Sequence, residues 1–145
     1  MVTDDDVLKV QRLYPQIYLG CHKQHVRATS TSFRISSQDA SILVHLDSEV
    51  PIAPQTLAAH LGIKPPTLSA AIARLARLGY LEITTDQRDR RKRELRLTKR
   101  GLEAIKAASV LDADRVLEML RCLTSKEKRE ALHGLELLAK AARCR

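Results

Sequence analysis

Two short segments with alternating apolar and polar residues enclose the most cationic stretch of the chain. Residues 81–84 and 94–97 both alternate in this way, which gives each segment one apolar face, as in a half-buried β-strand. Between them, residues 85–93 read Thr-Asp-Gln-Arg-Asp-Arg-Arg-Lys-Arg. We therefore predict a β-hairpin with a long, cationic tip.

The cationic tip favours an external polyanion as its partner. Gathering like charges on one loop stabilises a folded protein little, because guanidinium groups repel one another and ordering them costs side-chain entropy. The formal net charge of the chain is +8, and residues 51–98 carry nine Lys or Arg against four Asp or Glu. DNA, RNA or an anionic surface fits this balance. A charged loop that is merely solvated is the simpler alternative.

Length and composition limit the class of protein. The 145 residues suit one compact domain, or a small domain with dimerisation elements. Cys21, Cys122 and Cys144 lie far apart and indicate no disulfide framework. No stretch approaches the roughly 18 consecutive apolar residues of a membrane span, and three aspartates near the start are unlike a secretory signal. We expect a cytoplasmic protein with no membrane partner.

Proline and glycine mark out two short helices ahead of the hairpin. Pro54 suits the first turn of a helix that Gly62 ends. Pro65 and Pro66 suit the first turn of the next helix, where a missing N–H does no harm, and Gly79 ends it. Two helices joined by a three-residue turn predict a helix-turn-helix, whose second helix offers small and hydroxyl residues at its exposed start.

Two helices are expected before this motif. Apolar residues at helical spacing predict a long first helix from Val7 to about Thr29, with a kink or a helix start allowed at Pro15. Ser36 or Ser37 can cap a second helix that ends near residues 47–48. The short segment at residues 50–52 can pair briefly at a sheet edge.

Two further helices are expected after the hairpin. Thr98 is a possible N-cap for one long helix over residues 99–123, which carries a wide apolar stripe. Thr124 and Glu127 have the spacing of a capping box, which marks the start of a last helix towards the C-terminus.

The predicted fold class is therefore mainly α (α+β). A winged helix-turn-helix occupies residues 33–98, and long flanking helices at residues 1–32 and 99–145 form a dimerisation region. These helices cannot hide their apolar side chains against one small module, so we expect them to meet a second copy of the chain. A two-fold dimer would present two reading helices to successive major grooves of DNA. A monomeric helical cap is the alternative.

The motifs together resemble the MarR family of transcriptional regulators. The resemblance lies in Ile63–Ser69, Arg74-Leu75, Arg77–Leu81, Asp86–Arg91 and Leu97–Gly101. It implies a winged helix-turn-helix in each subunit, a homodimer held by the first and last two helices, and binding to a palindromic operator, most often as a repressor. It also implies a small-molecule effector bound between the dimerisation helices and the DNA-binding module.

The same resemblance implies which residues of the reading helix meet DNA. The helix that opens at Pro65 would enter the major groove. Its residues facing bases or nearby phosphates would be Pro66, Thr67, Ser69 and Ala70, and Arg74 would hold phosphate.

The wing motif transfers to this chain residue by residue. Arg91 matches the family's arginine that enters the minor groove, Asp89 matches the carboxylate that orients it, and Arg88 matches a second basic residue of the loop. A narrow minor groove concentrates negative potential, and a guanidinium fits it as a flat cation. For Asp89 a weak surface ion pair is the alternative role.

The chain departs from the family pattern at two positions. Many relatives carry a serine that caps the reading helix where this chain has Lys64, which cannot accept a hydrogen bond from free N–H groups but can contact phosphate. Ala70 stands where relatives often carry a larger polar side chain. Sequence specificity would therefore depend on Thr67, Ser69, DNA shape and the wing.

Sensing residues are less clearly marked. His22 and His25 are three apart, but two histidines without a third ligand are weak evidence for a metal, so we expect no metal and no cofactor. Cys21 lies on an apolar stripe where a small buried thiol is the usual outcome. A redox-responsive repressor that senses through Cys21 stays open as an alternative.

Two other function classes compete with DNA binding. Winged helices can serve as protein-interaction modules, so a basic surface that meets an acidic protein is an alternative to DNA binding. The chain has no glycine-rich phosphate loop, nucleophile elbow or metal-ligand cluster. Asp86 and Asp89 sit among arginines on a loop that is expected to be exposed, where general acid catalysis is poorly shielded. We therefore expect that the protein is not an enzyme.

Overall fold

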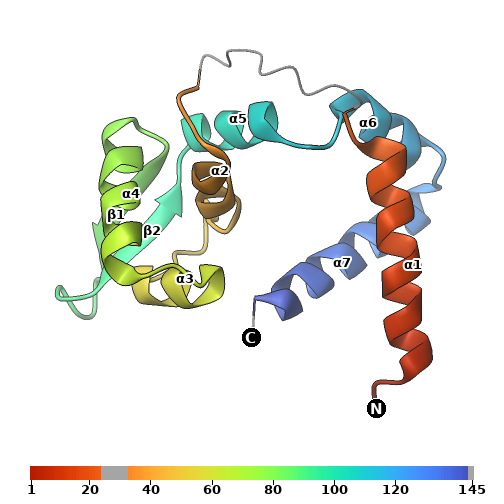
Figure 1. The fold of residues 1–145 in the computed structure, drawn as a ribbon, viewed down its shortest axis with the longest axis horizontal. Coiled ribbons are helices and arrows are strands. Elements are labelled where there is room, and N and C mark those ends of the chain that lie inside the picture. The colour runs from red at the N-terminus through yellow and green to blue at the C-terminus, as the bar shows by residue number, and fades with distance from the viewer. Residues whose placement is uncertain (24–32, 144–145) are drawn as a thin grey trace. The chain divides into compact units, whose positions relative to one another are not determined.

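The computed structural model describes residues 1–23 and 33–143. The elements follow one another as α1 (Asp4–Cys21), α2 (Ser37–Val44), α3 (Pro54–Leu61), α4 (Pro65–Arg77), β1 (Leu81–Thr85), β2 (Arg93–Leu97), α5 (Lys99–Ala108), α6 (Ala113–Arg121) and α7 (Ser125–Ala142) (Figure 1). The described residues fall into two compact units. The winged-helix unit holds α2 to α5 with the hairpin, and the helical unit holds α1, α6 and α7.

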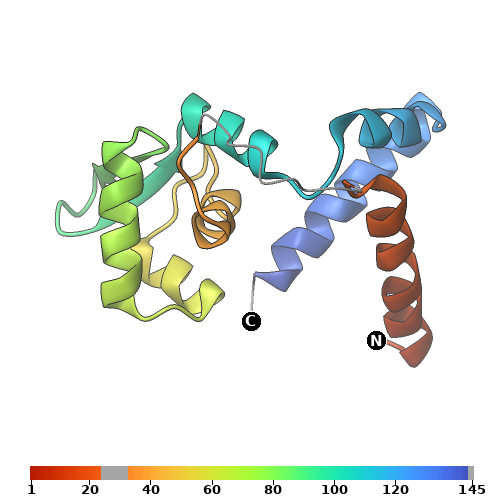
Figure 2. The same ribbon diagram turned by 45° about the horizontal axis from the view of Figure 1, so that its top comes forward.

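The helix-turn-helix forms where proline and glycine predict it. Pro54 opens α3, and Gly62 ends it in the left-handed conformation with φ 62°, which costs glycine little. Pro65 and Pro66 occupy the first turn of α4, and Gly79 follows its end with φ 82°. In Figure 2 the two helices are again seen in succession, with the hairpin tip protruding from the unit. The predicted helix-turn-helix and hairpin are both confirmed.

The hairpin is antiparallel and gains a third, short partner. Leu81 faces Leu97, and Thr85 faces Arg93, so the register spans both strands completely. Ile52 and Leu95 exchange both backbone hydrogen bonds, at 3.1 and 2.8 Å, as an isolated bridge beside β2. The brief edge pairing expected at residues 50–52 is therefore confirmed.

A contiguous hydrophobic core holds the winged-helix unit together. Its buried side chains come from every helix and both strands of the unit: Ile42, Leu43, Leu46, Leu57, Ala58, Leu68, Ile72, Leu75, Tyr80, Leu81, Leu95 and Ala104. Ala104 lies on α5, so this helix completes the core of the winged-helix unit, although the sequence grouped it with the flanking helices. A Cβ on Gly101 would lie 2.0 Å from the Tyr80 carbonyl oxygen, which explains the glycine at the start of α5.

The second helix begins and ends close to its expected limits. Ser36 is its N-cap, and α2 ends at Val44, a few residues before the expected end near residues 47–48. Thr98 accepts a hydrogen bond from the Gly101 N–H at 3.0 Å, which confirms it as the cap of α5. Thr124 and Glu127 form the expected capping box at α7.

The expectation of one continuous helix over residues 99–123 was wrong. The helix ends at Ala108, and α6 starts afresh behind Asp112, whose carboxylate accepts from the N–H groups of Asp114 and Arg115. Backbone pairing across the chain fixes the break, because Asp112 donates to Cys21 and Lys23 donates to Val110. These bonds use backbone groups that a continuous helix would satisfy internally.

The first helix also differs from its expected limits. Thr3 and Asp6 form a capping box, so α1 begins at Asp4 rather than near Val7. It continues through Pro15 and ends at Cys21, with His22 as its C-cap. The rest of the helix expected to about Thr29 lies in residues 24–29, outside the described residues.

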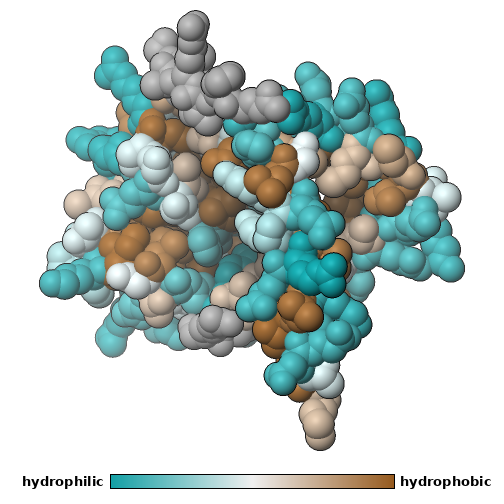
Figure 3. Space-filling view, turned by 45° about the vertical axis from the view of Figure 1, so that its right-hand side comes forward, coloured by the Kyte–Doolittle hydropathy of each residue, from teal (hydrophilic) through white to brown (hydrophobic). Residues whose placement is uncertain are grey.

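The helical unit has almost no buried side chains of its own. Among its described residues only Cys21 is buried, and its Sγ lies 3.6 Å from the Met119 Sδ. Large apolar side chains on all three helices are exposed: Val7, Val10, Leu13, Ile17, Leu117, Leu132, Leu135 and Leu138. Apolar side chains reach the molecular surface among hydrophilic ones in Figure 3. In the described parts of the chain, no helix has both the length and the apolar character to cross a bilayer.

Candidate nucleic-acid interface

The reading helix α4 has one buried face and one free face. Leu68, Ile72 and Leu75 are buried in the core of the winged-helix unit. The residues expected to meet DNA are all exposed on the other side, namely Pro66, Thr67, Ser69 and Ala70. Sequence and structure therefore agree that these side chains are free to contact a ligand.

The start of α4 offers a positive, unoccupied helix end. Lys64 is the N-cap and its side chain is exposed, with no capping hydrogen bond, as the residue type requires. Pro65 and Pro66 have no N–H, so Thr67 carries the first free donor of the helix. Among the described residues no acceptor bonds to it. A phosphate near Lys64 and Thr67 would meet an ammonium, an N–H group and the positive end of the helix dipole.

Hydrogen bonds order the tip of the hairpin. The Asp86 N–H donates to the Lys92 carbonyl at 2.9 Å, and the Lys92 N–H donates to the Asp89 carbonyl at 2.9 Å. The Asp86 carboxylate accepts from the Arg88 N–H at 2.7 Å, and the Asp89 carboxylate accepts from the Arg91 N–H at 3.0 Å. The two carboxylates therefore shape the loop through its backbone and are themselves half-buried.

The basic side chains of the tip point outward and remain available. Arg88, Arg90, Arg91, Lys92 and Arg93 are all exposed. Within residues 1–23 and 33–143, no ion pair engages any of them. Asp89 thus acts on Arg91 through its backbone N–H and not through an ion pair with its guanidinium. The arrangement presents a cluster of exposed cations on a hydrogen-bonded loop, which suits a polyanion.

Arg74 is placed differently from the other candidate residues. Its guanidinium forms an ion pair with Asp39 of α2, although the arginine side chain remains 41% exposed. Asp39 is 2% exposed and is the only buried charged residue of the described chain. Sequence reasoning missed Asp39, because its partner lies 35 residues away. The spacing of Ser36 and Asp39 marks a helix cap, but it does not predict the arginine.

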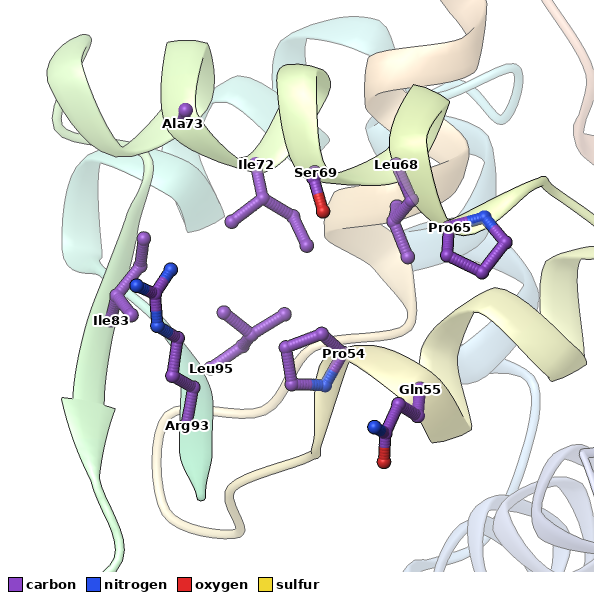
Figure 4. Close-up of a pocket in the computed structure, with 10 residues that line it drawn as sticks. All are labelled: Pro54, Gln55, Pro65, Leu68, Ser69, Ile72, Ala73, Ile83, Arg93 and Leu95. Carbon is purple, nitrogen blue, oxygen red and sulfur yellow. The ribbon is translucent and has the colours of Figure 1, made fainter. Parts of the chain in front are cut away.

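A cleft of about 300 Å³ lies within the winged-helix unit, between α4 and the hairpin. Its wall is mostly apolar, with Leu68 and Ile72 on α4 facing Ile83 and Leu95 on the strands (Figure 4). Ser69 and Gln55 add polar atoms, and Arg93 extends from β2 towards α4 (Figure 4). A small apolar molecule with an anionic group would match this lining.

The sensing residues considered from the sequence gain little support. His22 stacks on Tyr18 with ring centroids 5.5 Å apart, and His25 lies outside the described residues. The described residues hold no group of three or more His, Cys, Asp or Glu that could bind a metal ion. Cys21 is buried, as its position on the apolar stripe predicts.

Comparisons with known proteins agree with this geometry. Residues 35–92 match the model of the MarR family. No curated protein matches the sequence. The solved structures include the transcriptional regulator PcaV from Streptomyces coelicolor in complex with its natural ligand, which is 25% identical over 98% of this chain and 99% of that chain, with a TM-score of 0.52.

Two further solved structures share the fold. Streptococcus pneumoniae FabT in complex with DNA is 18% identical over 92% of each chain, with a TM-score of 0.55. Escherichia coli MarR in its apo form is 18% identical over 97% of each chain, with a TM-score of 0.52. The matched segment covers α2, the helix-turn-helix and the tip of the hairpin. Residues 35–92 of this chain are therefore similar to the MarR family of transcriptional regulators.

Proposed function

We propose that the protein is a dimeric, sequence-specific DNA-binding regulator of transcription in the cytoplasm. The observation that carries this proposal is that one compact unit holds both an exposed face of α4 and a hydrogen-bonded, cationic hairpin tip. The first would read the major groove through Thr67 and Ser69, and the second would insert Arg91 into the minor groove. Lys64 and Arg88 would hold the phosphate backbone, which positions the protein without reading sequence. A structural neighbour, FabT, is in complex with DNA.

The exposed apolar side chains of the helical unit support dimerisation. Leu132, Leu135 and Leu138 lie at helical spacing on α7, and each is at least 42% exposed. A helix with such a stripe gains stability mainly when the stripe is packed, since an isolated helix is marginal in water. A second copy of the chain would bury these leucines and bring two reading helices onto one palindromic operator. This supports residues 1–32 and 109–145 as the dimerisation region.

Repression released by a small molecule is the mode of regulation that we propose. PcaV, a structural neighbour, is in complex with its natural ligand. In this chain the cleft between α4 and the hairpin is one site where a small anionic molecule would part the two DNA-contacting elements. Cys21 is 2% exposed, so an oxidant would reach it poorly, which favours a small molecule over redox sensing.

The direct test begins with selection of bound fragments from genomic DNA. A recovered duplex should bind the purified protein much more tightly than a scrambled duplex of the same composition, and the affinity should fall steeply with salt because phosphate contacts release counterions. The absence of a preferred fragment, together with clear binding to an acidic protein, would contradict DNA binding and favour a protein-interaction module. Release of the bound duplex by small organic acids, compared with peroxide, then separates the two modes of regulation.

A further inference from the structure

A buried carboxylate joins the start of α2 to the reading helix. The Asp39 Oδ2 accepts a hydrogen bond from the Ser36 N–H at 2.7 Å, and the Asp39 N–H donates to the Ser36 Oγ at 3.1 Å. These two bonds cap α2. The other carboxylate oxygen, Oδ1, accepts from the Arg74 Nη2. One side chain therefore serves both a helix cap and an interhelical ion pair.

Arg74 lies at the edge of the face that α4 would present to DNA. It follows Ala70 by four residues and Thr67 by seven, so the three share one side of the helix. A guanidinium has five N–H donors in a fixed plane, and only one nitrogen is used on Asp39. The side chain is 41% exposed, which leaves its remaining donors able to reach a phosphate.

Burial separates the Asp39 carboxylate from those in the other ion pairs of the described residues. Asp39 is 2% exposed, whereas the ion pairs Lys106–Glu103, Lys126–Glu130 and Lys9–Asp5 join exposed side chains of one helix. Exposed pairs of that kind fix little, because solvent screens them and both side chains stay flexible. A charge-assisted bond from a buried carboxylate holds the guanidinium in one orientation.

We propose that Asp39 is a positioning residue for DNA recognition, which holds the Arg74 guanidinium so that its free N–H groups meet a phosphate beside the reading face. Asp39 itself makes no contact with DNA. The inference rests on the proposed DNA-binding function. It describes the Arg74 side chain as oriented before DNA binds, not as moving freely. The ordering entropy of the arginine is then lost on folding, not on binding.

For the change in DNA affinity when Asp39 is neutralised, the proposal predicts the opposite direction from simple electrostatics. Removing a negative charge close to DNA should strengthen binding, if only the field of the protein mattered. If Asp39 positions Arg74, Asp39→Asn should instead weaken binding to the selected operator duplex. Asparagine keeps the size and one acceptor oxygen of aspartate, so the cap of α2 can survive while the ion pair is lost.

The experiment is a double-mutant cycle measured by fluorescence anisotropy on the duplex recovered from genomic selection, with thermal unfolding in parallel. Asp39→Asn and Arg74→Ala should each weaken operator binding about tenfold, and the double variant should bind no more weakly than Arg74→Ala alone. Ser36→Ala breaks the cap but keeps the ion pair, and Glu103→Gln makes the same charge change on an exposed site of α5. Both controls should stay within about twofold of the unsubstituted protein, on the scale set for independent surface sites.

The outcomes distinguish this inference from the function on which it rests. Unchanged or tighter operator binding by Asp39→Asn would overturn the inference alone. The inference would also fail if Asp39→Asn weakened operator binding equally when Arg74 was already alanine. If Asp39→Asn does not fold, Arg74→Lys provides the second variant: it keeps the charge but loses the planar fork, and it should lose several-fold in affinity at an unchanged melting temperature. Equal affinity of Arg74→Lys would overturn the inference. No binding of any duplex by the unsubstituted protein would instead contradict the proposed function.

Discussion

The winged-helix unit buries twelve hydrophobic residues in one contiguous core, whereas the described part of the helical unit buries Cys21 alone. Both units contain helices of ordinary length with apolar residues at helical spacing. The difference is that the winged-helix unit also has a sheet and helices that cross, so its apolar faces meet one another. The winged-helix unit therefore covers its own core side chains, while the helical unit leaves its leucines exposed. Fold stability and assembly are therefore expected to reside in different parts of the chain.

The largest expected effect comes from placing charge on the exposed leucines of α7. Leu135→Glu combined with Leu138→Glu should abolish the dimer and operator binding together, because two carboxylates cannot be buried at an apolar interface without partners. Sedimentation velocity and anisotropy measure the two losses. His133→Glu, on the opposite side of the same helix, adds negative charge without touching the stripe and should remain dimeric. If the doubly substituted protein remained dimeric, the dimer interface would not include these leucines.

Matched leucine truncations sharpen the comparison between the units. Leu75→Ala removes a fully buried side chain from the winged-helix unit and should lower the free energy of unfolding by about 2–5 kcal/mol, independently of protein concentration. Leu117→Ala removes a leucine that is 47% exposed on α6, and its effect should grow as the protein is diluted, because it weakens assembly. Denaturant titrations at two concentrations measure both. The comparison is contradicted if the two variants respond to dilution alike.

A substitution in the hairpin tip separates binding from stability. Arg91→Ala should weaken operator binding by about 1–3 kcal/mol and leave the melting temperature unchanged, because the side chain is exposed and makes no ion pair among the described residues. Lys126→Ala, which removes the same charge from α7, serves as the control and should bind nearly normally. Equal losses for both variants would mean that only total charge matters and that the wing is not specific.

The smallest expected effect concerns pH and the turn that follows α2. The backbone N–H groups of Val50 and Glu49 donate to the Asp47 carboxylate and lower its pKa below the ordinary value. The stability that this gives is present above the ordinary aspartate pKa and is lost as pH falls through the lowered one. Asp47→Asn should therefore remove a small part of the acid dependence of unfolding. Identical acid dependence in both proteins would show that these bonds contribute nothing.

Local signals account for the parts of the fold that could be predicted. Gly62, Pro65 and Gly79 set helix ends through backbone constraints that act within a few residues, and the hairpin strands alternate with period two. The exposed face of α4 followed from the same pattern, because its buried positions recur at helical spacing. The fold class and the exposure of the reading residues were therefore accessible from sequence.

Long-range pairing accounts for what was missed. The break between α5 and α6 depends on backbone bonds from residues 110–112 to residues 21–23, and the apolar stripe runs on across it. Asp112 was a local sign of a new helix start that could have been noticed. The pairing of Asp39 with Arg74 has no local sign, since either residue alone is compatible with a solvated surface. How far the apolar side chains of the helical unit become buried would depend on the proposed second copy, which local sequence patterns do not describe.

The most direct test of the central claim is the mass of the complex that the protein forms with a fluorescent operator duplex in sedimentation equilibrium. The account predicts two chains on each duplex at low salt, dissociating as salt is raised, with the free protein also dimeric. One chain per duplex, or a free protein that is monomeric at concentrations where it still binds the operator with full affinity, would contradict it.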